Sequence, residues 1–249
     1  MDKSPDYLGF ERFDSSVAAV YDRFFSDMQG WDNASTLIHS LSRGGPVLEL
    51  GIGTGRVALP LKKLGTRVDG IDGSKHMIEV LRAKPEGDQI AVTIGDMTCS
   101  DAPLSKYSLV YVVFNTFFDL PSESAQISCI SNAASKLVEG GRFLVHCFVP
   151  DLTRYVDGKH TSTRTKANGD TLREQSSLNA STQTIDGVHE VTLNGVSTSY
   201  PVRLRYCWPA ELDSMASLAG LKLERRWADW DGGDFTSNSH MHVSIYTKQ

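Results

Sequence analysis

Apolar and polar positions change their spacing along the chain, and between residues 46 and 148 short apolar runs alternate with longer amphipathic stretches. This alternation is typical of a parallel sheet whose strands are joined by helices. One helix is predicted after Ser74, whose hydroxyl can cap its first turn, and another over residues 123–138, ending at Gly140-Gly141. The predicted strands cover residues 47–50, 67–71, 90–94, 108–114 and 142–148.

After Pro150 the pattern becomes an alternation of Ser, Thr and apolar residues, which predicts antiparallel strands. We therefore expect an antiparallel β insertion over residues 150–206. A helix over residues 209–219 and strands over 221–228 and 241–247 then complete the first sheet. Three dipeptides inside the insertion favour the left-handed backbone of tight hairpins: Asn168-Gly169, Asp186-Gly187 and Asn194-Gly195.

The first 45 residues are predicted to form helical segments that carry many aromatic side chains. These aromatic residues form either part of the core or a lid over a ligand site, and both alternatives stay open. They are Tyr7, Phe10, Phe13, Tyr21, Phe24, Phe25 and Trp31.

Charge and composition narrow the class of protein. The 249 residues include 25 basic and 30 acidic side chains, a formal net charge of -5. A protein that binds nucleic acid usually carries the opposite balance, so we expect no nucleic-acid partner. Because there is neither a membrane-length apolar run nor a signal-peptide pattern, we expect a cytoplasmic protein without a membrane partner. The four cysteines form no CxxC pair, which fits reduced thiols.

The segment VLELGIGTGR, residues 47–56, joins an apolar strand directly to a glycine-rich turn and a helix. Gly51, Gly53 and Gly55 permit a sharp bend and let the backbone approach a ligand at the carboxyl end of a parallel sheet. A nicotinamide dinucleotide site would need a third small residue where Arg56 stands. The turn therefore indicates a different ligand.

Acidic residues end the next two predicted strands. Asp72 stands where a carboxylate can accept both hydroxyls of a ribose, although it could instead cap the helix before Ser74. Asp96 and Met97 stand where a carboxylate can accept from an adenine amino group and a thioether can pack on its ring. The glycine turn followed by these two acidic positions predicts an adenosine site.

With these motifs the chain resembles the class I S-adenosylmethionine-dependent methyltransferases, from about Tyr21 to the C-terminus. The resemblance implies an α/β fold with a seven-stranded Rossmann-like sheet and helices on both faces. It divides the chain into an N-terminal helical lid (1–45), a cofactor-binding core (46–149), the β insertion after the fifth strand (150–206) and a C-terminal completion of the core (207–249).

The resemblance further implies S-adenosyl-L-methionine as the cofactor. In that family the residue matching Glu49 and the glycines shape the methionine end of the site, and Tyr21 matches a lid tyrosine that borders the sulfonium. The implied cofactor-binding residues are Tyr21, Glu49, Gly51, Gly53, Gly55, Asp72, Gly73, Met77, Asp96, Met97 and Phe114.

The methyl acceptor is expected at the end of the fourth strand, in YVVFNTFFDL, residues 111–120. Phe117 and Phe118 either wall the acceptor pocket or belong to the core. Asp119 either orients the acceptor and relays its proton or caps the next helix. DNA amino-methyltransferases carry prolines here, and metal-dependent catechol-type enzymes carry an acid near Asn115. We therefore expect neither a nucleobase acceptor nor a metal.

Other acceptor contacts are expected from more distant parts of the chain. His146, near the end of the fifth strand, is either a substrate contact or a core histidine, and Tyr7 and Trp208 are further substrate-binding candidates. Tyr21 and Asp119 are the catalytic candidates.

The aromatic N-terminus and the insertion resemble the small-molecule branch that contains aminosugar and antibiotic-tailoring N-methyltransferases. The expected activity is methyl transfer to nitrogen or oxygen of a small polar metabolite, such as an amino sugar or antibiotic intermediate. The alternatives are an O-methyltransferase of a phenolic or carboxylic metabolite and a non-catalytic nucleoside-binding regulator. The insertion either covers the pocket or joins two subunits of a homo-oligomer.

Overall fold

A computed structural model describes residues 12–25 and 31–249 of the chain. Its larger sheet has seven strands in the order β10-β11-β5-β4-β1-β2-β3. The strands are β1 (Val47–Leu50), β2 (Val68–Asp72), β3 (Ala91–Ile94), β4 (Tyr107–Val112), β5 (Leu137–Phe148), β10 (Leu221–Trp227) and β11 (Met241–Lys248). The α-helices are α1 (Ser15–Phe25), α2 (Trp31–Ser42), α3 (Ala58–Lys63), α4 (Lys75–Arg82), α5 (Glu123–Lys136) and α6 (Pro209–Leu218).

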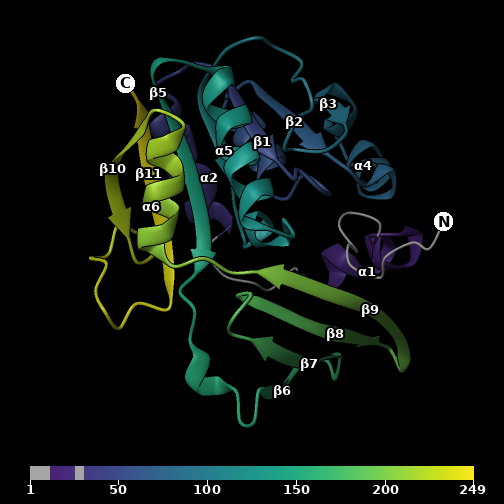
Figure 1. The fold of residues 1–249 in the computed structure, drawn as a ribbon. Helices are drawn as coiled ribbons and strands as arrows, with labels where there is room; N and C mark the ends of the chain where they lie inside the picture. The colour runs from purple at the N-terminus through teal and green to yellow at the C-terminus, as the bar shows by residue number, and fades with distance from the viewer. Residues whose placement is uncertain (1–11, 26–30) are drawn as a thin grey trace, which may run out of the picture.

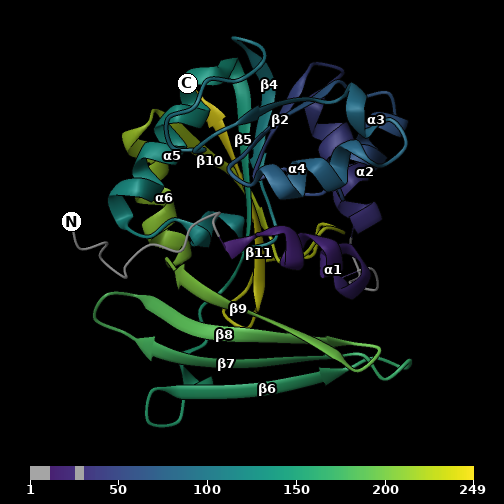
Figure 2. The same ribbon diagram turned by 90° about the vertical axis from the view of Figure 1, so that its right-hand side faces the viewer.

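The first five strands run parallel, and β10 and β11 close the sheet as an antiparallel pair beside β5. Figure 2 shows α5 and α6 on one face of this sheet and α2, α3 and α4 on the other. β1 and β4 lie near its middle and are almost entirely buried, as expected for strands covered on both faces. The predicted seven-stranded α/β fold is confirmed.

The antiparallel insertion after the fifth strand is also confirmed. It is a separate sheet in the order β6-β7-β8-β9, which lies below the larger sheet in Figure 1 with β9 nearest to it. Its strands are β6 (Lys159–Thr165), β7 (Thr171–Asn179), β8 (Thr184–Leu193) and β9 (Val196–Arg205). The exact division of the chain into four domains stays a prediction.

One of the three expected hairpin turns is wrong. Asn194-Gly195 turns between β8 and β9 with φ angles of 51° and 79°, as the dipeptide predicts. Asp186-Gly187, however, lies inside β8. A Cβ at position 187 would lie 2.3 Å from the carbonyl oxygen of Gln175 on β7, so this glycine allows close strand contact and does not form a turn.

The end of α5 also differs from the prediction. The helix ends at Lys136, and Leu137 already pairs with Tyr107 of β4. Gly140 and Gly141 therefore lie inside β5, next to a shift in its register, and do not stop the helix. At α4 the prediction is confirmed, because the Ser74 hydroxyl accepts from the Met77 amide.

A third hydrophobic cluster, beside the two on the faces of the larger sheet, joins α1 to the insertion. Val17 of α1 packs there with inward-facing residues of β7, β8 and β9: Leu172, Val191, Leu193, Tyr200 and Val202. This packing places α1 between the carboxyl ends of the parallel strands and the second sheet (Figure 2).

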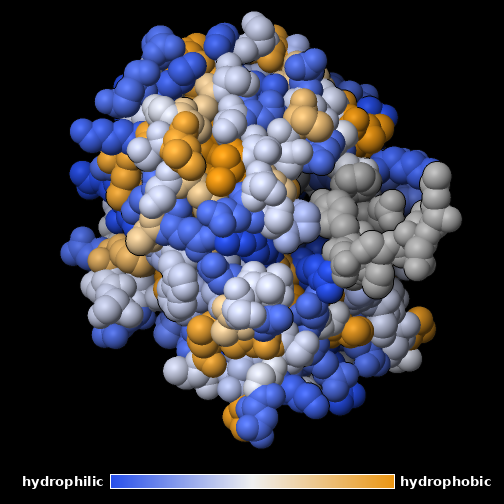
Figure 3. Space-filling view, viewed as in Figure 1, coloured by the Kyte–Doolittle hydropathy of each residue, from blue (hydrophilic) through white to orange (hydrophobic). Residues whose placement is uncertain are grey.

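On the face of the molecule drawn in Figure 3, the hydrophobic residues of the described chain form small groups among hydrophilic ones. None of the described helices is long and apolar enough to cross a membrane. Homo-oligomer formation through the insertion stays a prediction.

Candidate functional site

A cavity of about 450 Å³ lies at the carboxyl ends of the parallel strands, and residues of α1 and the second sheet line its other sides. This is the edge where open α/β sheets bind ligands, and the volume is in the range of small-molecule sites. Every cofactor-binding residue expected from the sequence lines it except Gly55.

The three glycines of the turn are required by their backbone angles and by the atoms that surround them. All three have positive φ angles, between 54° and 78°. A Cβ on Gly51 would lie 2.4 Å from Thr116 Cγ2, and one on Gly55 would lie 2.3 Å from Leu81 Cδ1, so both positions are closed by packing. Gly53 faces the cavity, with only Met77 Cε near the place of a Cβ, which leaves its backbone open to a ligand.

Asp72 fixes the backbone of the glycine turn and of the segment before α4, whereas the helix cap itself is Ser74. The Asp72 carboxylate accepts from the Ser74 amide at 2.8 Å and from the Gly53 amide at 2.7 Å, and it lines the cavity. A carboxylate has about four acceptor positions, so two remain for hydroxyls of a ligand. Burial raises its pKa, and the two amide hydrogen bonds oppose this shift.

Glu49 of β1 is a second buried carboxylate in the cavity. Burial raises its pKa to about 8, although a hydrogen bond from the Tyr111 hydroxyl at 2.9 Å favours the charged form. A carboxylate with this pKa gains its charge when a cation binds beside it.

The end of β3 supplies Asp96 and Met97, which line the cavity beside Gly73 and Met77. The Thr98 amide donates to Asp96 Oδ1 at 2.8 Å, and Asn132 Nδ2 donates to the Met97 carbonyl at 3.0 Å. These bonds fix the loop so that both side chains face the same part of the cavity.

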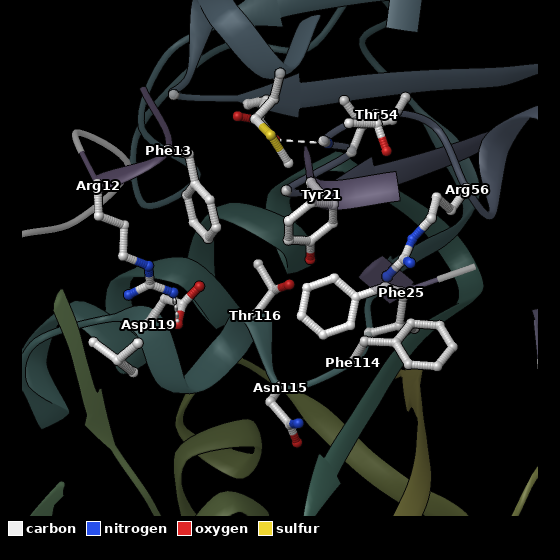
Figure 4. Close-up of a pocket in the computed structure, with 18 of the residues that line it drawn as sticks. Arg12, Phe13, Tyr21, Phe25, Thr54, Arg56, Phe114, Asn115, Thr116 and Asp119 are labelled. Atoms are coloured by element: carbon white, nitrogen blue, oxygen red, sulfur yellow. Dashed lines mark hydrogen bonds and ion pairs between the residues drawn. The ribbon is translucent and has the colours of Figure 1, made fainter. Parts of the chain in front are cut away.

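Aromatic residues of the N-terminal segment cover the opposite side. Tyr21 packs against Phe13 and Phe25, with ring centroids 5.9 and 4.8 Å away, and the Arg56 guanidinium lies 4.9 Å from its ring centroid. Figure 4 shows the Tyr21 ring facing the middle of the cavity. The Ser74 hydroxyl donates to the Phe13 carbonyl at 2.6 Å, which holds this segment over the cofactor edge.

The end of β4 has an unusual backbone. Phe114 and Asn115 both have positive φ angles, 56° and 70°, which non-glycine residues rarely adopt. His146 stabilises this turn: its Nδ1 accepts from the Phe114 amide and its carbonyl accepts from the Asn115 amide, both at 3.1 Å. Burial lowers the His146 pKa to about 3, so the ring is neutral. His146 supports the cavity from behind and does not line it.

Asp119 pairs with Arg12 at 2.5 Å beside this turn (Figure 4). Burial raises the pKa of Asp119, and the Arg12 charge opposes the shift. The Arg12 side chain is 6% exposed, and its Nε and Nη1 atoms have no hydrogen-bond partner among the described residues. Both residues line the cavity, so this ion pair supplies groups of both charges to its wall.

Besides His146, three expected substrate contacts lie outside the cavity lining. Phe117 and Phe118 have no exposed surface and pack in the core between the sheet and α5, which corrects their expected place in the cavity wall. Their short helix, Thr116–Asp119, directs them inward and leaves Thr116 and Asp119 at the cavity. Trp208 precedes α6, is 41% exposed and does not line the cavity. Tyr7 lies outside the described residues.

Comparison with known proteins identifies the family. A family profile described as "Methyltransferase domain" matches residues 47–141. The CcbJ methyltransferase from Streptomyces caelestis has a similar structure, with a TM-score of 0.81 and 37% sequence identity over 88% of this chain and 95% of that one. The chain belongs to the class I S-adenosylmethionine-dependent methyltransferases.

Two further relatives cover most of this methyltransferase. The cypemycin N-terminal methyltransferase of a Streptomyces species is 25% identical over 213 residues, 83% of this chain and 84% of that protein. CalS10, an amino pentose methyltransferase from Micromonospora echinaspora, shares the fold, with a TM-score of 0.70 and 16% identity over 92% of this chain and 97% of that one.

The cavity of the methyltransferase fits S-adenosylmethionine. The open backbone at Gly53 and the carboxylate of Asp72 can receive the ribose end, and Asp96 with Met97 can border the adenine. The ammonium and sulfonium charges of the methionine end match the buried carboxylate of Glu49 and the aromatic face of Tyr21.

The insertion contributes cavity residues that sequence reasoning missed. Polar residues from all four of its strands line the cavity: Arg164, Glu174, His189 and Tyr200. His189 and Tyr200 are equally distant from the Asn194-Gly195 turn, so the hairpin register could have paired them. Glu174 could not be added, because the misplaced turn at Asp186-Gly187 gave the wrong register for β7 and β8.

Proposed function

We propose that this methyltransferase transfers the methyl group of S-adenosylmethionine to a nitrogen atom of a small polar metabolite, such as an amino sugar or an antibiotic intermediate. Oxygen is the alternative acceptor atom. The bound cofactor supplies an activated methyl group on a sulfonium. The protein orients the acceptor lone pair behind this methyl group and excludes water, and such positioning can supply about 7 to 11 kcal/mol of a barrier.

The observation that carries this proposal is that the second sheet lines the acceptor half of the cavity. Inward-facing residues of β7 and β9 line it together with the Arg12–Asp119 pair. A cavity of this size with polar groups of both charges suits a small acceptor that has an amine and oxygen atoms.

The proposed roles of the site residues follow from their places. Tyr21 borders the sulfonium and methyl group, where its ring face favours a cation. Asp119 orients the acceptor amine through its carboxylate, and Arg12 donates to an acceptor oxygen. Asn115 and Phe114 form the wall between the two ligands.

The names of the relatives agree with an amine acceptor. One acts on an amino pentose and another on the N-terminus of cypemycin. Both names describe methylation of compounds with amino groups, and a peptide amine therefore belongs in any acceptor test.

The test is incubation with S-adenosylmethionine that carries a labelled methyl group and with a panel of amino sugars, small amines, phenols, carboxylates and short peptides. Label should appear in an amino compound, and carbon-13 NMR of the product identifies the methylated atom. Transfer to a phenol or carboxylate would support the O-methyltransferase instead. Cofactor binding without transfer to any acceptor would favour the nucleoside-binding regulator.

A further inference from the structure

Four polar residues form a continuous row across the inner face of the second sheet. Ser162, Glu174, His189 and Tyr200 stand directly opposite one another on β6, β7, β8 and β9. The Ser162 hydroxyl donates to Glu174 Oε2 at 2.8 Å, Glu174 Oε1 lies 3.4 Å from His189 Nε2, and His189 Nδ1 lies 3.4 Å from the Tyr200 hydroxyl. Cross-strand neighbours at such positions are in direct contact.

Exposure falls along this row toward the cavity. The Glu174 side chain is 36% exposed and that of His189 26%, whereas Tyr200 is only 6% exposed. Tyr200 also belongs to the hydrophobic cluster under α1, and all three residues line the cavity. The row therefore connects a buried hydroxyl in the acceptor half of the cavity with a carboxylate that reaches solvent.

We propose that Tyr200, His189 and Glu174 form a proton relay that removes the proton of the methyl acceptor. This inference rests on the proposed function, because it assigns the relay to the acceptor of that reaction. Tyr200 is the group that touches the acceptor. His189 and Glu174 act through it, with His189 Nε2–H toward Glu174 and the unprotonated Nδ1 toward the Tyr200 hydroxyl.

The proton balance of the step is complete. The acceptor ammonium gives a proton to the Tyr200 oxygen while the phenol proton passes to His189 Nδ1. The free nitrogen lone pair then forms the N–C bond as the C–S bond breaks, and the electrons of that bond stay on sulfur. His189 ends as an imidazolium beside Glu174. The Nε2 proton of this imidazolium then leaves to solvent past Glu174, the exposed end of the row.

The surroundings of His189 keep its ring neutral, so that one ring nitrogen is free to receive a proton. Burial is the main influence and lowers the His189 pKa, and the Arg12 charge acts in the same direction. Glu174 and Asp119 oppose the shift. Tyr200 faces Tyr21, Arg12, Glu174 and Asp119, and burial raises its pKa. Neutral His189 can accept a proton, and neutral Tyr200 can pass one on without becoming a phenolate.

A first experiment tests the relay without any acceptor. Nitrogen-15 NMR of the histidine rings, with His189→Gln used to assign the signals, reports which ring nitrogen of His189 carries the proton. We expect the Nε2–H tautomer at pH 7.5 and a shift of the Nδ1 signal in Tyr200→Phe. A proton on Nδ1, or unchanged signals in Tyr200→Phe, would overturn the relay.

A second experiment uses the acceptor found in the panel. His189→Gln and Tyr200→Phe should each lower kcat about 100-fold at pH 7, within the usual range for acid–base catalysis. The loss should shrink as the pH approaches the pKa of the acceptor amine, because the free amine then needs no base. The KM for the cofactor should not change in these variants. Glu174→Gln should lower kcat less than the other two substitutions, and this loss of kcat should depend on pH in the same way.

The control is His160→Gln, which replaces a histidine of the same sheet that contacts Arg154 outside the cavity. It should keep the wild-type pH profile. A loss of equal size at every pH in His189→Gln would show a purely structural role and overturn the relay. If no acceptor is methylated by the wild-type enzyme, the proposed function fails, whereas the NMR result still decides the relay geometry.

Discussion

Asp22 of α1 accepts a hydrogen bond from the Thr54 hydroxyl of the glycine turn at 2.5 Å, and its other carboxylate oxygen pairs with Lys84. Lys84 also donates to the Thr54 carbonyl at 2.6 Å. These contacts attach the N-terminal helix to the turn that faces the cofactor. Because Tyr21 precedes Asp22 in this helix, the same contacts fix the aromatic side of the cavity.

Asp22→Asn should therefore speed the dissociation of S-adenosylhomocysteine, measured by stopped-flow fluorescence. The side chains of Lys84 and Asp22 are about one-third exposed, and such pairs contribute about 1 kcal/mol or less, so the melting temperature should change little. Glu79→Gln, which removes a surface pair with His76 on α4, is the control. Equal dissociation rates in both variants would show that the Asp22 contacts do not hold the ligand.

Asp72→Ala should weaken cofactor binding at least tenfold, about 1.4 kcal/mol. The substitution removes the proposed ribose acceptor and also the partner of the Gly53 and Ser74 amides. Titration calorimetry measures the affinity, and Asp101→Ala, an exposed aspartate after β3, is the control. Wild-type affinity in Asp72→Ala would refute its proposed role.

Cofactor binding should release a proton at Glu49. Below a pH of about 8 this buried carboxyl is largely protonated, and a bound cation lowers its pKa, so affinity should rise with pH up to about 8. Calorimetry at pH 7 in buffers with different ionisation enthalpies counts the protons released. Because the ligand's own amine also titrates in this range, Glu49→Gln is the necessary reference. The same proton count in both proteins would exclude Glu49 as the source.

His146 should make the fold sensitive to acid. Its pKa of about 3 in the folded protein lies below its ordinary value of 6.5, so the unfolded chain binds the proton first. The stabilisation from the neutral ring is complete above about pH 6.5 and is lost as the pH falls toward 3. Over this range the free energy of unfolding falls by up to about 1.4 kcal/mol per pH unit.

Urea denaturation between pH 7 and pH 4.5 measures this effect. His146→Gln should unfold at lower urea concentration at pH 7 and show a flatter pH dependence than the wild type. His76→Gln, on the surface of α4, should keep the wild-type slope. A slope unchanged by His146→Gln would mean that another group controls acid unfolding.

The cofactor edge was predictable because its determinants are local. The glycine turn directly follows β1, and Asp72 and Asp96 lie at or just after the ends of β2 and β3, so parallel strand order alone brings them to one edge. The same reasoning failed at Phe117 and Phe118, because the short helix after β4 reverses which side chains face inward.

The sequence by itself determined the α/β sheet, the insertion and the glycine turn with its acidic partners, since each depends on hydrophobic spacing or on residues that need particular backbone angles. Only the tertiary structure decided the acceptor half. Arg12 meets Asp119, and Glu174 meets His189 and Tyr200, because α1 and the second sheet fold onto the first, and strand register and helix docking depend on packing between distant segments.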